Sequence, residues 1–229
     1  MHGLNTSFAT DPASFLAARP VNVSAILPRT IAAGGAVSTS PMIDTIKYGA
    51  FDLSADGGQA WLREASLTAA TGGDQALVAY WCPFAQSNGK AGFVDIPKTK
   101  PTTDYVFTAA MNGCSLIVTA SDKPDCFRLH HHQHPSGVSR AIVNAASGIT
   151  ERAIVFEFAE VDYNTPATAG TFFQTFNFLR FEAGKWKLYS QYTKLTLAAG
   201  GTTKVRTVIS TALLDPAHPL IVRDVPMPG

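Results

Sequence analysis

Short runs of β-branched and aromatic residues, separated by turn-forming residues, recur along most of this chain and constrain its fold more than any other feature. Such runs are typical of β-strands that bury one or both faces. The predicted strands are residues 76–81, 105–108, 114–119, 126–133, 153–158, 172–181, 186–197 and 202–211. Helical composition is confined to residues 59–66 and to a short stretch at 14–18. We therefore expect an α+β fold, a sandwich of mixed β-sheets with a few flanking helices.

The length of 229 residues fits one large domain. Residues 1–40 are rich in Ala, Ser, Thr, Pro and Gly and show no clear periodicity, so we expect a loosely structured N-terminal segment there. Residues 41–229 are predicted to form a single domain. No internal repeat interrupts this part of the chain.

The charge balance excludes an obvious electrostatic partner. The chain has 18 Lys and Arg residues and 17 Asp and Glu residues, which gives a formal net charge of +1. Nucleic-acid binding is not expected, because it calls for a basic excess or a basic stripe. No uncharged apolar run reaches the roughly 18 residues of a membrane span. The first 20 residues lack a basic start and contain Asp11, so no ordinary secretory signal peptide is expected.

The most informative pattern joins a cysteine to a histidine across a predicted hairpin. If residues 114–119 and 126–133 pair as antiparallel strands joined by 120–125, Cys114 directly faces His131. Residues alternate between the two faces of a strand, so the histidines on either side of His131 point the other way. A slip of one residue would present His130 or His132 to the cysteine instead.

A thiol beside an imidazole is the minimum equipment for nucleophilic catalysis. A neighbouring His⁺ lowers the pKa of a cysteine and yields a reactive thiolate. Asn112 and Gly113 can adopt positive φ angles. Their backbone N–H groups, together with that of Cys114, could donate to an oxyanion.

Three spacings around this pair resemble a known enzyme family. Thr108 stands six residues before Cys114, His131 follows the cysteine by 17, and Pro135 comes four residues after the histidine. This pattern is similar to the core of the cysteine-dependent protein-glutamine deamidases: bacterial chemoreceptor deamidases, the catalytic domain of cytotoxic necrotizing factor, and the lethal factor of Burkholderia. The matched core is residues 103–137, with a weaker likeness at 188–192.

The resemblance implies a hydrolase that deamidates a glutamine of a target protein to glutamate. Cys114 would be the nucleophile, His131 the general acid and base, and Thr108 the residue that orients the imidazole. It further implies a bacterial toxin or virulence effector that is secreted or injected without a cleavable signal and acts in the cytosol. The partner would be a protein carrying the substrate glutamine, such as a small GTPase or a translation factor. No cofactor is expected.

Several alternatives use the same residues. Transglutamination or cysteine peptidase activity would need the same Cys–His pair, whereas a non-catalytic binding module would need neither group. Cys82 and Cys126 are interpreted as structural. His130 and His132 are expected to form a solvated face. Clustered histidines can bind transition metals, but no carboxylate-rich partner lies nearby in the sequence, so no metal site is expected.

Overall fold

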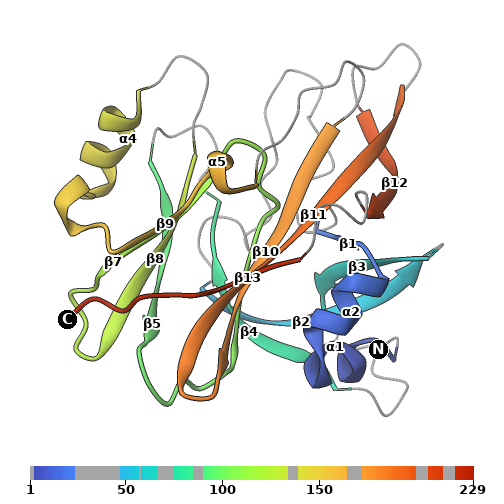
Figure 1. Ribbon diagram of the computed structural model, residues 1–229, viewed down its shortest axis with the longest axis horizontal. Helices are drawn as coiled ribbons and strands as arrows, with labels where there is room; N and C mark the ends of the chain where they lie inside the picture. Colours follow the sequence, from blue (N-terminus) through green and yellow to red (C-terminus); the bar gives the residue numbers. More distant parts are fainter. Residues whose placement is uncertain are drawn as a thin grey trace.

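Two β-sheets packed face to face, with short helices at their margins, make up the computed structural model (Figure 1). It describes residues 3–23, 47–56, 58–65, 75–84, 90–133, 139–163, 172–199, 206–213 and 220–229. The expected α+β class, with β-sheets dominating, is therefore confirmed.

The larger sheet contains nine of the described strands in the order β1-β3-β2-β4-β6-β10-β11-β12, with β13 also pairing with β11. Their bounds are β1 (Val21–Asn22), β2 (Tyr48–Asp56), β3 (Gln59–Glu64), β4 (Leu77–Cys82), β6 (Tyr105–Thr108), β10 (Phe172–Glu182), β11 (Lys185–Ala199), β12 (Arg206–Leu213) and β13 (Ile221–Asp224). The β1–β3 and β4–β6 pairs are parallel, and the other pairs are antiparallel. The long strand β11 holds β13 along its first part and β12 along its last part.

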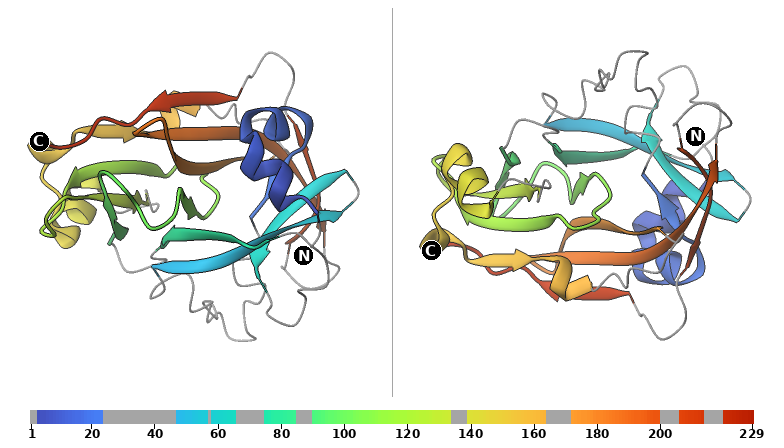
Figure 2. Two further views of the ribbon diagram at one scale, coloured as in Figure 1. Left: turned by 90° about the horizontal axis from the view of Figure 1, so that it is seen from below. Right: turned by 90° about the horizontal axis from the view of Figure 1, so that it is seen from above.

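The smaller sheet has the order β5-β8-β7-β9, and all of its pairs are antiparallel. Its strands are β5 (Gly92–Pro97), β7 (Ser115–Ala120), β8 (Cys126–His132) and β9 (Phe156–Phe158). Figure 2 shows this sheet lying between two arms of the larger sheet, one formed by β10, β11 and β13 and the other by β2 and β4.

The helices are short and lie outside the sheet layers. They are α1 (Asn5–Thr10), α2 (Pro12–Ala18), α4 (Arg140–Ser147), the 3₁₀ turn η2 (Glu151–Ala153) and α5 (Glu160–Tyr163). Helix α4 begins at a Ser139 cap that accepts a hydrogen bond from the Ile142 N–H, and it ends at Gly148 with φ of 67°.

Side-chain alternation along the central strands divides the interior into two cores. Phe107 and Phe178 point into the first core, where Phe8 of α1 packs against them. Their neighbours Val106 and Leu179 point into the second core, which fills the space between the two sheets. The Val106 and Leu179 side of these two strands therefore faces the smaller sheet.

The N-terminal segment is more ordered than expected. Residues 5–22 form α1, α2 and β1, with Phe8 and Leu16 buried. Gln191 of β11 fixes this segment, because its Nε2 donates to the Leu16 carbonyl at 2.6 Å and its Oε1 accepts from the Val21 N–H at 2.8 Å. The short helix expected at 14–18 is confirmed as part of α2, whereas the prediction of a loose lead-in is wrong for α1 and β1. Residues 24–46 lie outside the described ranges.

Two further predictions of local structure are corrected. Residues 59–66 have helical composition, but β3 occupies 59–64 because its backbone pairs with both β1 and β2 and its Trp61 and Leu62 side chains are buried. The predicted strand at 153–158 starts instead with η2, and only Phe156–Phe158 pairs with β7.

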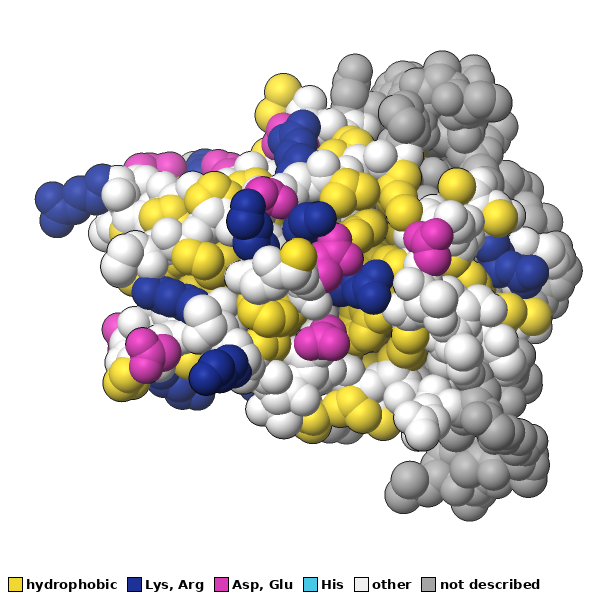
Figure 3. Space-filling model, turned by 60° about the horizontal axis from the view of Figure 1, so that its bottom comes forward, with side chains coloured by type: hydrophobic (Ala, Val, Ile, Leu, Met, Phe, Trp, Pro, Cys, Tyr) yellow, Lys and Arg dark blue, Asp and Glu magenta, His cyan; other side chains and the backbone are white. Residues whose placement is uncertain are grey.

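The surface carries both signs of charge close together. On the face shown in Figure 3, Lys and Arg side chains are interspersed with Asp and Glu side chains among apolar patches. Arg180, Glu182 and Lys187 form a mixed charged group, with Lys187 Nζ 2.8 Å from a Glu182 carboxylate oxygen. Among the described residues, no helix is long and apolar enough to cross a membrane.

Candidate functional site

The three predicted site residues lie where the two sheets meet. Thr108 is the last residue of β6 on the larger sheet, His131 lies in β8 of the smaller sheet, and Cys114 immediately precedes β7. Their exposed fractions are 1%, 0% and 8%, so the group is almost entirely buried.

The register of the hairpin differs from the predicted one by two residues. His131 is opposite Leu116, and His132 is opposite Ser115, so the continued ladder sets Cys114 against Gln133. A shift of two residues preserves the face on which each side chain lies, because the strand period is two. Cys114 and His131 thus remain on one face as diagonal neighbours, a relationship in which residues lie about 7–8 Å apart.

Thr108 and His131 form the tightest contact in the group. Thr108 Oγ1 lies 2.7 Å from His131 Nδ1 and donates to the Cys82 carbonyl at 2.9 Å. Because the hydroxyl hydrogen is directed to Cys82, Oγ1 accepts from an Nδ1–H. This tautomer leaves His131 Nε2 unprotonated, and that buried atom has no hydrogen-bond partner among the described residues.

Burial makes the His131 imidazole neutral. Loss of solvation, and secondarily the nearby His132, lowers the pKa of His131 from 6.5 to about 3. The ring of Phe84 packs edge-on against it at 5.0 Å between centroids. We expected a histidinium that lowers the pKa of the thiol; the structure instead holds a neutral ring with an unprotonated Nε2.

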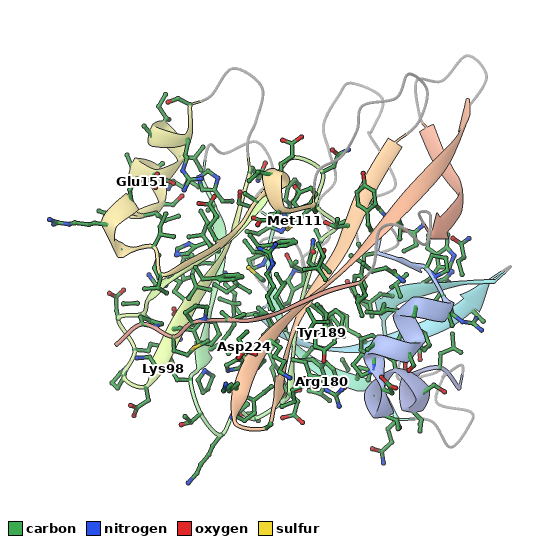
Figure 4. All side chains as sticks on the ribbon, in the orientation of Figure 1. Lys98, Met111, Glu151, Arg180, Tyr189 and Asp224 are labelled. Carbon is green, nitrogen blue, oxygen red and sulfur yellow. The ribbon has the colours of Figure 1, made fainter. Side chains whose placement is uncertain are left out.

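The backbone before Cys114 is held from two sides. Met111, labelled in Figure 4, forms a bridge with Thr175 of β10, with N–H to carbonyl distances of 3.0 and 2.9 Å. On the other side, the Tyr163 hydroxyl of α5 donates to the Cys114 carbonyl at 2.7 Å. Between them Gly113 has φ of 82°, a conformation that glycine adopts without strain.

His130 and His132 are buried, which corrects the expectation of a solvated face. Thr119 Oγ1 on β7 lies 3.0 Å from His130 Nε2, and Asn144 Oδ1 on α4 lies 2.9 Å from His132 Nε2. Asn144 in turn donates to Glu151, which is labelled in Figure 4. These contacts engage the Nε2 atom of each histidine on the far side of the sheet from Cys114.

The described residues contain no group of three or more His, Cys, Asp and Glu side chains arranged to hold a metal. His134, the fourth histidine of the cluster, lies outside the described residues.

The other two cysteines lack the setting of a nucleophile. Cys82 is fully buried, its Sγ donates to the Leu129 carbonyl at 3.4 Å, and loss of solvation raises its thiol pKa to about 12. Burial also raises the pKa of Cys126, which is partly exposed at the start of β8. Both thiols are therefore protonated at neutral pH.

The sequence analysis missed two polar residues beside the site. Asn177 of β10 and Ser190 of β11 are directly opposed, and both are at most 1% exposed. They lie on the same face as Leu179 and Leu188, which pack between the sheets. The sequence signal that could have identified them is a polar residue at an inward-facing position of an otherwise apolar strand. A polar side chain at such a position is buried and needs a hydrogen-bond partner.

Comparison with known proteins identifies one family. The family described as the Mcf1 activator-binding domain matches residues 5–213. No curated protein matches the chain. Among solved structures, the C-terminal domain of CNFy from Yersinia pseudotuberculosis is similar over 87% of this chain and 77% of its own, at 10% identity and a TM-score of 0.36. These values are too low to establish a shared fold.

Proposed function

This chain belongs to the family of Mcf1 activator-binding domains, and we propose that it binds a partner protein that acts as an activator. The observation that carries this proposal is the extent of the match, which runs from α1 to the end of β12 and includes every described strand except β13. This match favours a non-catalytic binding module among the alternatives that the sequence left open.

Affinity capture followed by reconstitution tests the binding proposal. The immobilised chain is used to capture a protein from host-cell extract, and the purified candidate is then mixed with the chain in sedimentation velocity experiments. We expect a complex of defined stoichiometry that forms equally well with the Cys114→Ala variant, because binding does not require the thiol. Failure of every purified candidate to form a complex would contradict the proposal.

A second function, deamidation of a protein glutamine, is supported by one specific contact. Thr108 Oγ1 and His131 Nδ1 lie 2.7 Å apart, which orients the ring and leaves Nε2 unprotonated on the side of the sheet that carries Cys114. A nucleophile, a base and a third group that orients the base are the parts of a cysteine hydrolase.

The reaction would proceed in two halves. His131 Nε2 accepts the Cys114 proton, and the thiolate attacks the carboxamide carbon to form a C–S bond, while backbone N–H groups at Gly113 and Cys114 stabilise the oxyanion. The C–N bond then breaks, and the proton on Nε2 goes to the departing ammonia. In the second half Nε2 takes a proton from water, hydroxide attacks the thioester, and the C–S bond breaks as the thiolate regains that proton.

Conversion of glutamine to glutamate in a candidate target tests this second function. Purified small GTPases and translation factors are incubated with the chain, and peptide mass spectrometry and ammonia release are measured. We expect activity that the Cys114→Ala variant lacks. Incorporation of a labelled amine would identify transglutamination instead, and backbone cleavage would identify a peptidase. We place this activity, as that of a toxin or effector, in the cytosol of a target cell reached by secretion or injection.

A further inference from the structure

A row of polar side chains crosses four neighbouring strands of the larger sheet. Cys82 of β4 pairs with Thr108 of β6, and Asn177 of β10 pairs with Ser190 of β11. Phe107 is opposite Phe178, so the next residue of each strand places Thr108 opposite Asn177. We call Cys82, Thr108, Asn177 and Ser190 the polar row.

The polar row faces the smaller sheet. Cys82 belongs to the core between the sheets, and Thr108 contacts His131 directly. Asn177 and Ser190 follow by strand alternation from Leu179 and Leu188 in the same core. Adjacent strands are about 4.8 Å apart, so Asn177 is next to the Thr108–His131 contact and Ser190 is one strand further away.

Three buried polar atoms around this row have no hydrogen-bond partner in the part of the chain that the structure describes: Asn177 Oδ1, Ser190 Oγ and His131 Nε2. The orientation of the Asn177 amide follows from its surroundings. Its Nδ2 donates to Thr175 Oγ1 at 2.7 Å, and that hydroxyl has the Met111 carbonyl as its own acceptor at 3.4 Å. The atom left over on Asn177 is therefore an acceptor.

Buried acceptors such as these are suited to an occupant that donates hydrogen bonds, either a ligand group or water. Roughly 90% or more of buried polar groups in proteins are paired. Asn177 Oδ1 and His131 Nε2 are acceptors, and Ser190 Oγ can accept as well. A carboxylate offers only acceptors and would meet lone pairs, whereas the NH₂ of a primary carboxamide offers two donors.

We infer that Asn177 and Ser190 form a recognition site for a primary carboxamide, with its NH₂ group held by Asn177 Oδ1 and Ser190 Oγ beside Cys114. This inference rests on the second proposed function, the thiol chemistry at Cys114. It makes Asn177 and Ser190 the residues that select a glutamine side chain over a glutamate side chain at this site.

Two alkylating reagents that differ only in their amide hydrogens test the inference. Iodoacetamide carries a primary carboxamide, and 2-iodo-N,N-dimethylacetamide carries the same reactive carbon without N–H donors. In both cases the thiolate forms an S–C bond as iodide leaves. Labelling of Cys114 in the full chain is measured by peptide mass spectrometry, and the ratio of the two rates is divided by the ratio for glutathione.

We expect the normalised ratio to favour iodoacetamide about tenfold in the unmodified chain, because each hydrogen bond to the NH₂ group contributes a factor of several. Asn177→Ala and Ser190→Ala should each bring the ratio toward one. Gln174→Ala is the matched control, since Gln174 is a buried residue of the same strand that points to the opposite face. It should leave the ratio unchanged.

The outcomes separate the inference from the function on which it rests. If both reagents label Cys114 with a normalised ratio near one, the carboxamide site is overturned and the unpaired atoms are simply hydrated, while the nucleophile remains. If neither reagent labels Cys114, the thiol chemistry fails and the inference fails with it. Circular dichroism checks that each variant is folded, and Asn177→Ser replaces Asn177→Ala if the latter is not.

Discussion

Thr108 Oγ1 and His131 Nδ1 are 2.7 Å apart although the two residues come from different sheets. The threonine hydroxyl also donates to the Cys82 carbonyl, so one buried side chain connects β4, β6 and β8. The contact therefore joins the two layers of the fold and fixes the tautomer of the imidazole at the same point.

Replacing Thr108 should affect stability and thiol reactivity together. Thr108→Val removes the hydroxyl but keeps the shape, so the buried His131 Nδ1–H loses its acceptor and the Cys82 carbonyl loses the hydrogen bond from Thr108. We expect the free energy of unfolding in urea to fall by about 1–3 kcal/mol and alkylation of Cys114 to slow. Thr108→Ser is the control, since it keeps the hydroxyl and should retain both the free energy of unfolding and the rate of Cys114 alkylation. Equal losses in the two variants would show that the methyl group, and not the hydrogen bond, matters.

The buried histidines predict a fall in stability between pH 6.5 and 4.5. Burial lowers the pKa of both His130 and His131 from 6.5 to about 3, so the unfolded chain binds more protons than the folded chain in this range. The contribution of each neutral histidine to stability is complete above its pKa in the unfolded chain. It is lost as the pH falls toward its pKa in the folded chain. We expect the free energy of unfolding to drop by about 1.4 kcal/mol per pH unit for each histidine.

Urea titrations at pH 7, 6 and 5 measure this slope. His130→Gln removes one of the two titrating groups and should roughly halve the slope, while His131 continues to titrate. A slope that stays the same in the variant would mean that other groups cause the loss of stability.

The sequence placed Cys114 and His131 on one face of the hairpin, as the structure does, even though it misjudged the register. The predicted pairing of Cys114 with His131 is off by two residues. The innermost pair of the hairpin is Ala120 with Phe127, one residue further along each strand than assumed. An error of two leaves every side chain on the same face, so the contact of His131 with Thr108 does not depend on it. An error of one would have presented His130 or His132 instead.

Features that depend on distant parts of the chain were beyond the sequence pattern. The residues at 59–64 have helical composition, but pairing with two other strands outweighs that local preference. The burial of His132 depends on α4, whose Asn144 reaches it from 12 residues away. The depressed pKa of His131 likewise arises from burial between two sheets, which no local spacing reveals.

Gly113 offers a test of the backbone at Cys114. Its φ is 82°, and a Cβ built there would meet only a Glu160 oxygen at 3.9 Å, so strain and not crowding opposes a side chain. We expect Gly113→Ala to lower the free energy of unfolding by about 1–2 kcal/mol and to change the rate of Cys114 alkylation. Gly184→Ala is matched, because Gly184 has φ of 79° with nothing within 4 Å and lies in the β10–β11 turn. It should lose similar stability without changing the alkylation rate.

The N-terminal helices should depend on Gln191. Its side chain bonds the Leu16 and Arg19 carbonyls at 2.6 and 2.7 Å and accepts from the Val21 N–H at 2.8 Å. Gln191→Leu removes these three hydrogen bonds, so we expect a loss of about 3 kcal/mol and faster proteolysis within residues 3–23. Gln174→Leu is the control, since Gln174 Nε2 has no partner among the described residues and its removal should change stability by less than about 1 kcal/mol. Equal losses in the two variants, or unchanged proteolysis in Gln191→Leu, would mean that the apolar contacts of Phe8 and Leu16 hold this segment without the glutamine.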